Sequence, residues 1–353
     1  MPDPTPLILE VAQRFRQQLL ARERRAASAL VRYYGDTWAR LQPEIRRLRG
    51  EIEEMRAAGE EISPERMNGL PRLRSIEAQA QQQLLQFAEY ADGAIGGAQR
   101  EAIAAAERDA PALMRAAYPT DAAIEIRFDR MPREAVENLV GFLQDGSPLK
   151  DLLDEAVGAA IDDFASTMVT GMVAGWNPRR LARTLRSDFG MGLTQALKIS
   201  RTEQLRAYRT TSLNAYRTSN VCSGWEWLAT LSPRTCMSCL EKDGTRYPLS
   251  AEFEDHVQGR CCPVPITLSY AEMGIDAPEP DFTREKGHDW FLRQDESTQR
   301  GMMKALYDPW KDGQFALEDI PKLVKSDVWG NSWTPKTLEE LVPEKEVHHS
   351  IPS

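Results

Sequence analysis

Hydrophobic residues recur at helical spacing from residue 7 to residue 58, which predicts long helical structure in this stretch. Pro43 is expected near a helix start or kink, because proline removes a backbone donor and disrupts a helix interior. The stripe consists of Ile8, Val11, Ala12, Phe15, Leu19, Ala26, Leu30, Tyr34, Trp38, Leu41, Ile45, Leu48, Ile52 and Met55. One face of this helical region is therefore predicted to be buried.

Residues 73–117 are rich in alanine, glutamine and glutamate, which predicts one long helix or a broken pair of helices. Three glycines in this stretch suggest a break or a close approach between helices, since glycine has no side chain and weakens a helix. They are Gly93, Gly96 and Gly97. Between these two predicted helical regions, residues 60–71 contain Ser-Pro and Asn-Gly, so a loop is predicted there.

Helical patterns continue after residue 119, following a short alternating segment at 124–128 that favours extended backbone. The sequence Gly175-Trp-Asn-Pro178 predicts a helix end and a new helix start, with glycine as the C-terminal cap, asparagine as the N-cap and proline in the first turn. The predicted helices cover residues 132–143, 148–173, 179–188 and 193–219.

The pattern changes after residue 220, where turn residues and cysteines replace the helical spacing. Residues 225–229 are strand-like and residues 264–266 could supply a return strand, so a short β-hairpin around the cysteines is predicted. A last helical segment is predicted over residues 287–325, followed by a loosely held tail that includes Pro335, Pro343, His348 and His349.

These patterns predict a mainly α fold with a small α+β, zinc-knuckle-like module. The predicted regions are a helical N-terminal region (1–118), a helical middle domain (119–220), a β-hairpin and Cys-His module (221–270), a C-terminal helical extension (284–330) and a tail (331–353).

Composition limits the classes of protein that fit. The formal net charge of −9 over 353 residues argues against a nucleic-acid coat. No hydrophobic run reaches the roughly 18–20 residues that span a bilayer, and the first residues lack the features of a signal peptide, so no membrane partner is expected. The five cysteines are odd in number and clustered, which indicates a reducing compartment, the cytoplasm at synthesis, rather than a disulfide framework.

A local excess of arginine lies near the N-terminus. Residues 11–49 contain ten arginines against three acidic residues, and the arginines are Arg14, Arg16, Arg22, Arg24, Arg25, Arg32, Arg40, Arg46, Arg47 and Arg49. One interpretation is a solvated helix face, and the other is contact with an acidic protein surface or with DNA phosphates. Interleaved aromatic residues and a recognition motif are missing, which argues against readout of DNA sequence.

The densest chemistry of the sequence lies between residues 236 and 262. Cys236 and Cys239 form a Cys-x-x-Cys pair, His256 follows after sixteen residues, and Cys261 and Cys262 come next. Zinc is held by four such ligands, with two thiolates from one turn and a second pair from a distant segment. A closed structural zinc site is the leading prediction. A metal-free cluster of thiols and a redox-active Cys-x-x-Cys pair remain as alternatives.

Polar residues on the preceding helix are candidates for interaction with a partner. The candidates are Arg201, Glu203, Arg206 and Asn214, together with Trp225 on the strand that follows. Enzymatic readings are weaker. His288 with Asp289, or His256 with Asp255 and Glu254, could serve a nuclease or another hydrolase, but the sequence indicates no second group within hydrogen-bond reach. We therefore expect a protein without a catalytic residue.

The order of these motifs resembles the phage head-morphogenesis (Mu F-like) minor capsid family over about residues 120–340. The matching pieces are Ser200-Arg-Thr-Glu203, Asn214, Gly224-Trp225, Arg234-Thr-Cys236, Cys239, Asp243-Gly244, His256, Arg260-Cys261 and Pro265. Family members often have a His-x-x-Cys-Arg-Cys return, whereas residue 259 is glycine here. Cys261 is the expected fourth zinc ligand, with Cys262 as the alternative.

The resemblance implies a minor head protein of the virion that binds the portal protein or the major capsid protein during head assembly. Such a protein would lie in the capsid interior or near the portal, and could assist DNA packaging or ejection. Two alternatives remain: a nuclease- or toxin-like enzyme carried on the same module, and a packaging factor that contacts DNA through the N-terminal arginines.

Overall fold

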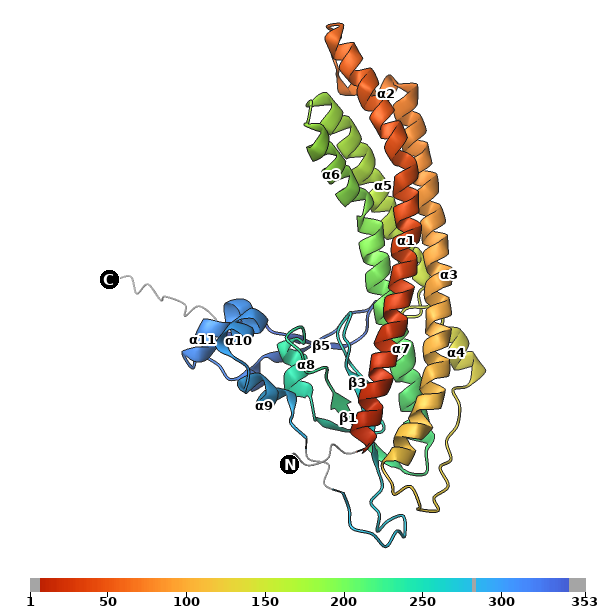
Figure 1. Ribbon diagram of the computed structural model, residues 1–353, viewed down its shortest axis with the longest axis vertical. Coiled ribbons are helices and arrows are strands. Elements are labelled where there is room, and N and C mark those ends of the chain that lie inside the picture. Colours follow the sequence, from red (N-terminus) through yellow and green to blue (C-terminus); the bar gives the residue numbers. More distant parts are fainter. Residues whose placement is uncertain (1–6, 281–283, 343–353) are drawn as a thin grey trace, which may run out of the picture. The chain divides into compact units, whose positions relative to one another are not determined.

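The computed structural model describes residues 7–280 and 284–342, which divide into two compact units (Figure 1). Unit 1 comprises residues 1–18, 103–132 and 208–353, and unit 2 comprises residues 19–102 and 133–207. Each unit is thus assembled from segments that are far apart in the sequence. No helix of the described residues is both long enough and apolar enough to cross a membrane.

Three long helices contribute residues to both units. They are α1 (Leu7–Ala57), α3 (Pro71–Ala116) and α7 (Met191–Thr218). Helix α1 continues through Pro43, so the alternative of a helix start at this proline is wrong. The ring of Pro43 is exposed on the solvent side of the helix, while Leu41 and Leu48 are fully buried on the other side. Burial of the apolar stripe offsets the one hydrogen bond that proline removes.

Helix α3 is also continuous, and its glycines do not break it. A Cβ added at Gly96 would make ordinary van der Waals contact with Val140 Cγ1 at 3.7 Å, while one added at Gly93 or Gly97 would meet nothing within 4 Å. The predicted loop at residues 60–71 contains the short helix α2 (Pro64–Gly69). The Ser63 side chain accepts a hydrogen bond from the Arg66 backbone N–H and proline occupies the first turn, so the Ser-Pro pair marks a helix start.

The regular secondary structure in the described residues of unit 2 is helical, apart from an isolated β-bridge between Phe142 and Pro148. Besides its shares of α1, α3 and α7 it contains α2, α4 (Arg133–Leu139), α5 (Leu149–Val173) and α6 (Pro178–Phe189). Phe189 is fully buried at the centre of an aromatic cluster, 5.0 Å from Tyr34, 5.4 Å from Trp38 and 5.8 Å from Phe164 between ring centroids.

The predicted stop and restart before α6 is present in unit 2. Gly175 has a φ of 63°, a conformation that favours glycine, and follows the C-terminal end of α5. The Asn177 side chain accepts a hydrogen bond from the Arg179 backbone N–H at 2.9 Å and caps α6. Local sequence chemistry therefore fixes this turn.

Unit 1 contains the β-structure. The strands β1 (Cys222–Leu228), β2 (Arg246–Pro248) and β3 (Cys262–Thr267) form an antiparallel sheet in the order β2-β1-β3. Trp225 pairs with Pro265 across β1 and β3, so the predicted antiparallel pairing of these two segments is confirmed. The additional strand β2 lies between them in the sequence and pairs with the other edge of β1. The mainly α fold with a small β portion is likewise confirmed. The segment 124–128 alternates between half-buried and exposed side chains but belongs to none of the strands.

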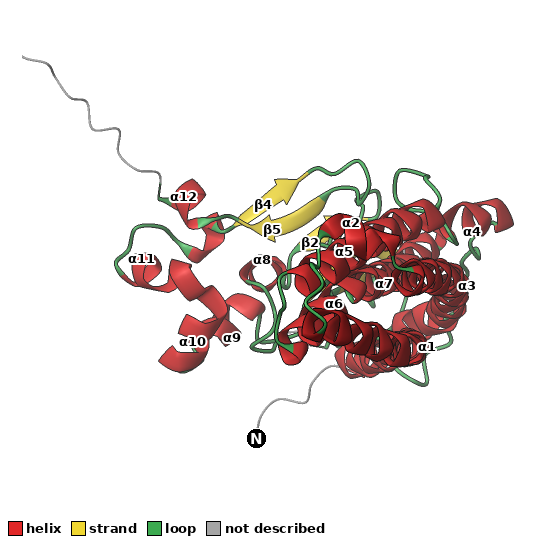
Figure 2. Cartoon of the chain, turned by 90° about the horizontal axis from the view of Figure 1, so that it is seen from above, coloured by secondary structure: helices red, strands yellow, loops and turns green. Residues whose placement is uncertain are grey.

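The C-terminal part of unit 1 differs from the predicted long helix. It contains α8 (Met237–Lys242), α9 (Gly287–Leu292), α10 (Glu296–Met303), α11 (Tyr307–Lys311) and α12 (Leu338–Leu341), with a hairpin of β4 (Pro321–Val324) and β5 (Ser332–Pro335) (Figure 2). This region contains three prolines, at Pro309, Pro321 and Pro335, and proline interrupts long helices. Strand β5 and α12 occupy part of the predicted tail; residues 343–353, including His348 and His349, lie outside the described residues.

Candidate metal centre

The Cys-x-x-Cys pair lies at the start of α8. Cys236 is the N-cap of this helix, and its sulfur accepts a hydrogen bond from the Cys239 backbone N–H at 3.4 Å. The Thr235 hydroxyl donates to the Thr230 carbonyl and helps to shape the loop before the helix. One tight turn therefore holds both sulfurs on the same side of the chain.

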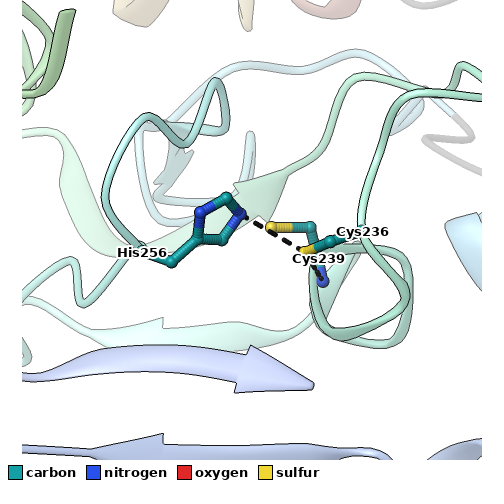
Figure 3. Close-up of side chains that lie close together, drawn as sticks. All are labelled: Cys236, Cys239 and His256. Atoms are coloured by element: carbon teal, nitrogen blue, oxygen red, sulfur yellow. Dashed lines mark hydrogen bonds between the residues drawn. The ribbon is translucent and has the colours of Figure 1, made fainter. Parts of the chain in front are cut away.

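His256 faces this pair from a distant loop (Figure 3). Its Nε2 lies 3.3 Å from the Cys236 Sγ, and its Nδ1 lies 2.9 Å from the Val257 carbonyl oxygen. A carbonyl partner on Nδ1 favours the tautomer in which Nε2 is free to bind a metal. Among the described residues, Cys236, Cys239 and His256 form one group whose potential ligand atoms all lie within 4.8 Å of one another.

A second group shares Cys239 with the first and adds Asp255 and Cys261. Cys261 is buried, and the Cys239 Sγ lies 3.7 Å from Asp255 Oδ1. Cys262 belongs to neither group and lies on β3, where it is also buried. The structure thus brings Cys261 rather than Cys262 toward the Cys-x-x-Cys pair, and it adds Asp255, a residue that spacing alone did not select as a ligand.

The electrostatics of the group favour a thiolate at Cys236. A hydrogen bond from the Cys239 thiol, with a further contribution from His256, lowers the pKa of Cys236 to about 5. The same contact with Cys236 raises the pKa of Cys239. Burial opposes protonation of His256, but contact with Cys236 and Asp255 outweighs it and raises the imidazole pKa to about 10. The lowered pKa of Cys236 and the raised pKa of His256 favour a thiolate beside a protonated imidazole.

Arg209 on α7 fixes the loop that carries His256 and Cys261. Its guanidinium donates to the Cys261 carbonyl at 2.8 Å, to the Gly259 carbonyl at 2.9 Å and to Asp255 Oδ2 at 2.6 Å. The loop itself makes a β-turn, with a hydrogen bond from the Gly259 N–H to the His256 carbonyl and Gln258 at a φ of 63°. A non-glycine residue in this conformation is a local strain that the surrounding contacts maintain.

Two pairs of stacked aromatic rings involve the tryptophans of β1. Trp225 stacks on Tyr247 with ring centroids 4.2 Å apart, and Trp227 stacks on Phe253 at 4.1 Å. The glycine before Trp225 is required, because a Cβ at Gly224 would lie 2.6 Å from the Tyr247 carbonyl oxygen. The Gly-Trp motif therefore lets β2 approach β1 closely and buries a large aromatic side chain.

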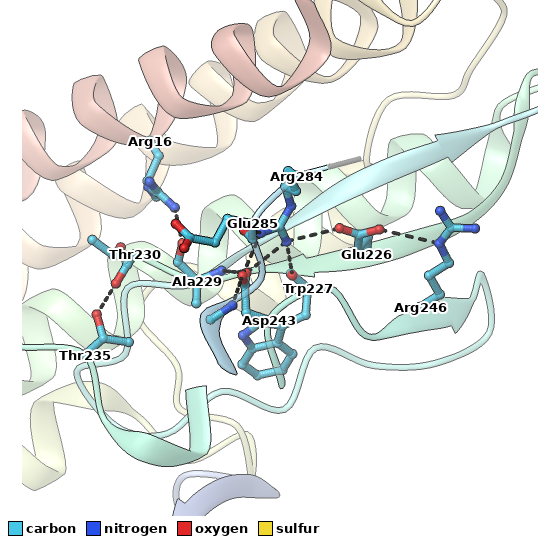
Figure 4. Close-up of polar contacts among 11 residues, drawn as sticks. Arg16, Glu226, Trp227, Ala229, Thr230, Thr235, Asp243, Arg246, Arg284 and Glu285 are labelled. Atoms are coloured by element: carbon cyan, nitrogen blue, oxygen red, sulfur yellow. Dashed lines mark hydrogen bonds and ion pairs between the residues drawn. The ribbon is translucent and has the colours of Figure 1, made fainter. Parts of the chain in front are cut away.

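A buried ionic network joins β1 to α9 (Figure 4). The carboxylate of Asp243 is fully buried and accepts hydrogen bonds from the Ala229 N–H at 2.7 Å, the Gly287 N–H at 2.9 Å and Arg284 at 2.6 Å. Arg284 also pairs with Glu226 at 3.1 Å. The Asp-Gly motif at residue 243 thus has a structural role that sequence spacing alone did not reveal.

The interaction candidates all make contacts inside the chain. Arg201 pairs with Glu23 at 2.6 Å, Arg206 pairs with Glu203 at 2.5 Å, and Asn214 donates to the Asp129 carbonyl at 3.1 Å. Glu203 and Trp225 are buried, and burial raises the pKa of Glu203. A role of these five residues in partner binding stays a prediction.

His288 has an acidic partner that sequence analysis did not identify. Its Nδ1 lies 3.0 Å from Glu241 Oε2 and 3.8 Å from Glu318 Oε1. Forty-seven residues separate His288 from Glu241, so spacing carries no signal of this contact. The hydrogen bond with Glu241 raises the pKa of His288.

The side chains around Cys239 suit zinc. Thiolates and imidazole nitrogen are its preferred ligands, and tetrahedral zinc with the usual bond lengths places ligand atoms about 3.3–3.8 Å apart. The distance of 3.3 Å between Cys236 and His256 falls in this range. A buried carboxylate beside thiols and a histidine is also a usual feature of zinc sites, as a ligand or as a partner of one. Zinc bound here would cross-link α8 to the loop before β3.

Comparison with known proteins finds a family match for the region that contains this site. Residues 162–265 match the model of the family described as phage Mu protein F like protein, which confirms the Mu F-like resemblance over the part of the chain from α5 to β3. No curated protein and no solved structure matches the chain.

Proposed function

We propose that this chain, whose residues 162–265 match the phage Mu F-like family, is a phage minor head protein that binds the portal protein or the major capsid protein during head assembly. The family match carries the proposal, since it covers the predicted ligands from Cys236 to Cys261 and the helices before them. The Mu F-like family is structural, which is compatible with a protein that performs no turnover.

We assign the metal the role of making one small module rigid. This docking module consists of the sheet β2-β1-β3, α8 and the loop before β3. The sheet β2-β1-β3 is small, and a small module gains stability from a metal that joins distant segments. Zinc held by Cys236, Cys239, His256 and Cys261 would fix α8 and the loop before β3 in one arrangement. A partner could then bind this surface without first paying the entropy of ordering it.

Elemental analysis of the purified protein tests the zinc site. The wild-type chain should contain a single zinc ion, and the Cys236→Ser/Cys239→Ser variant should contain none and unfold at a lower temperature. Cys222→Ser is the matched control, because Cys222 is a buried cysteine of β1 outside both ligand groups. Wild-type protein without zinc, or a double variant as stable as the control, would refute this part of the proposal.

Co-expression with the portal protein and, separately, with the major capsid protein of the same phage tests the assembly role. We expect one of them to co-purify with the wild-type chain and the Cys236→Ser/Cys239→Ser variant to co-purify less, with Cys222→Ser unchanged. If neither protein co-purifies at low salt, the proposed partners are wrong, whatever the zinc content.

A DNA-contacting role is a second candidate, supported by the exposure of seven of the ten N-terminal arginines. These are Arg14, Arg24, Arg25, Arg32, Arg40, Arg46 and Arg47. DNA binding through such residues would weaken steeply as salt rises, because it releases counterions from the phosphates. Salt-independent binding, or none at low salt, would exclude this role.

A further inference from the structure

The candidate metal centre contains a buried carboxylate whose placement calls for an explanation. The Asp255 side chain is only 1% exposed, and its two oxygens face in different directions. Oδ2 accepts from Arg209 at 2.6 Å, whereas Oδ1 lies 3.7 Å from the Cys239 Sγ and 3.8 Å from the His256 Nε2. Arg209 supplies the cation that a buried carboxylate needs at Oδ2, and Oδ1 faces the Cys239 thiol and the His256 imidazole.

The Asp255 carboxylate occupies the space that a side chain at residue 259 would need. A Cβ added at Gly259 would lie 2.0 Å from Asp255 Oδ2 and 2.2 Å from its Cγ, far closer than real Cβ contacts. Any larger residue at position 259 therefore requires Asp255 to move. A cysteine at residue 259 and the present position of the Asp255 carboxylate exclude each other.

We propose that Asp255 is a direct oxygen ligand of the metal, at the place where a cysteine side chain at residue 259 would otherwise close the site. This inference rests on the proposed zinc site and changes its fourth ligand. Tetrahedral zinc takes four side chains, so Asp255 binds with Cys236, Cys239 and His256 in place of Cys261. Asp255 Oδ1 lies within 0.5 Å of the separation expected between ligand atoms of tetrahedral zinc, measured to both Cys239 and His256. Carboxylate oxygen is an ordinary zinc ligand.

The surroundings of Asp255 support this role. Its Oδ1 also accepts the backbone N–H of His256 at 2.8 Å, which fixes the carboxylate relative to the imidazole. Arg209 is buried on the opposite side and balances the negative charge that a carboxylate adds to a thiolate-rich site. An anchored carboxylate with one oxygen held by arginine leaves the other oxygen oriented toward the ion.

Metal titration of the full chain tests the proposal through affinity and through the spectrum of bound Co²⁺. In Asp255→Asn, zinc affinity should fall by at least about tenfold, and the ligand-field bands of Co²⁺ should shift because one anionic oxygen ligand is lost. Asp243→Asn is the matched control. Asp243 is an equally buried carboxylate that is paired with arginine and lies in neither group of potential ligands, so its variant should bind Co²⁺ with an unchanged spectrum.

A second variant keeps the test decisive if Asp255→Asn fails to fold. Asp255→Ala with Gly259→Cys removes the clash and supplies a thiol in the vacated space, so it should bind Co²⁺ with a stronger thiolate charge-transfer band than the wild type. Gly259→Cys alone should bind metal worse than the double variant.

The outcomes separate the two ideas. A wild-type chain that binds neither Zn²⁺ nor Co²⁺ overturns the zinc site and this inference together. A wild-type chain that binds metal, with Asp255→Asn equal to it in affinity and spectrum, overturns only the role of Asp255. A double variant whose charge-transfer band is no stronger than that of the wild type also overturns it.

Discussion

Two arginines on α7 make nearly the same set of hydrogen bonds but differ in burial. Arg209 donates to two backbone carbonyls and to Asp255, and Arg217 donates to the Leu249 and Ala251 carbonyls and to Glu252. The Arg209 side chain is 8% exposed and its carboxylate partner 1%, whereas the corresponding values for the Arg217 pair are 30% and 68%. The pair therefore offers a controlled test of burial.

Replacing Arg209 with methionine leaves the carboxylate of Asp255 buried without the guanidinium that pairs with its Oδ2. Breaking a buried ion pair in this way costs about 3–5 kcal/mol of unfolding free energy. Arg217→Met removes a similar set of contacts, but water reaches the freed carbonyls and carboxylate, so we expect a loss of about 1 kcal/mol.

Chemical denaturation followed by tryptophan fluorescence measures both losses, since Trp225 and Trp227 report on unit 1. For a unit of this size, each kcal/mol shifts the melting temperature by about 2–4 °C, so Arg209→Met should melt about 6–20 °C below wild type. Hydrogen exchange should localise the change to the loop at 255–261. Equal losses for the two variants would refute the argument that burial of the ion pair sets the cost.

Three further predictions concern other parts of the chain. Gly171→Ala should lower the stability of unit 2 by about 1–3 kcal/mol in thermal unfolding, because the added Cβ would lie 2.5 Å from Leu181 Cδ1; no loss would mean that the Leu181 side chain moves aside without cost. Asn177→Ala should cost about 1 kcal/mol in the same assay through loss of the N-cap, and a neutral result would contradict that role. The hydrogen bond with Glu241 raises the pKa of His288, so the native state holds this proton more tightly; the resulting stability is full below about pH 6.5 and lost as pH rises through the raised pKa. Denaturation between pH 5 and 9 should show a loss that is about 1 kcal/mol larger in the wild type than in His288→Gln.

Several elements follow from local sequence alone, because their causes lie within a few residues. The apolar stripe of residues 7–58 predicts α1, the Gly-Trp-Asn-Pro sequence predicts the turn between α5 and α6, and the Cys-x-x-Cys spacing predicts two adjacent sulfurs. Errors of the same local reasoning arose at Pro43 and at Ser63-Pro64. At the first, tertiary burial outweighs a local penalty; at the second, a helix start was read as a loop signal.

The candidate site shows what the sequence by itself could not decide. Cys236, Cys239 and His256 were selected from residue type and spacing, and the Mu F-like resemblance was readable from the order of motifs. The positions of Asp255 and Arg209 depend on a contact between α7 and a loop some fifty residues later, and no periodicity encodes such a contact. The two compact units likewise combine segments that the linear order separates. Ligand chemistry is a property of residue types, so the sequence determines it; burial, charge pairing and the sharing of space between Gly259 and Asp255 arise only when distant segments pack together.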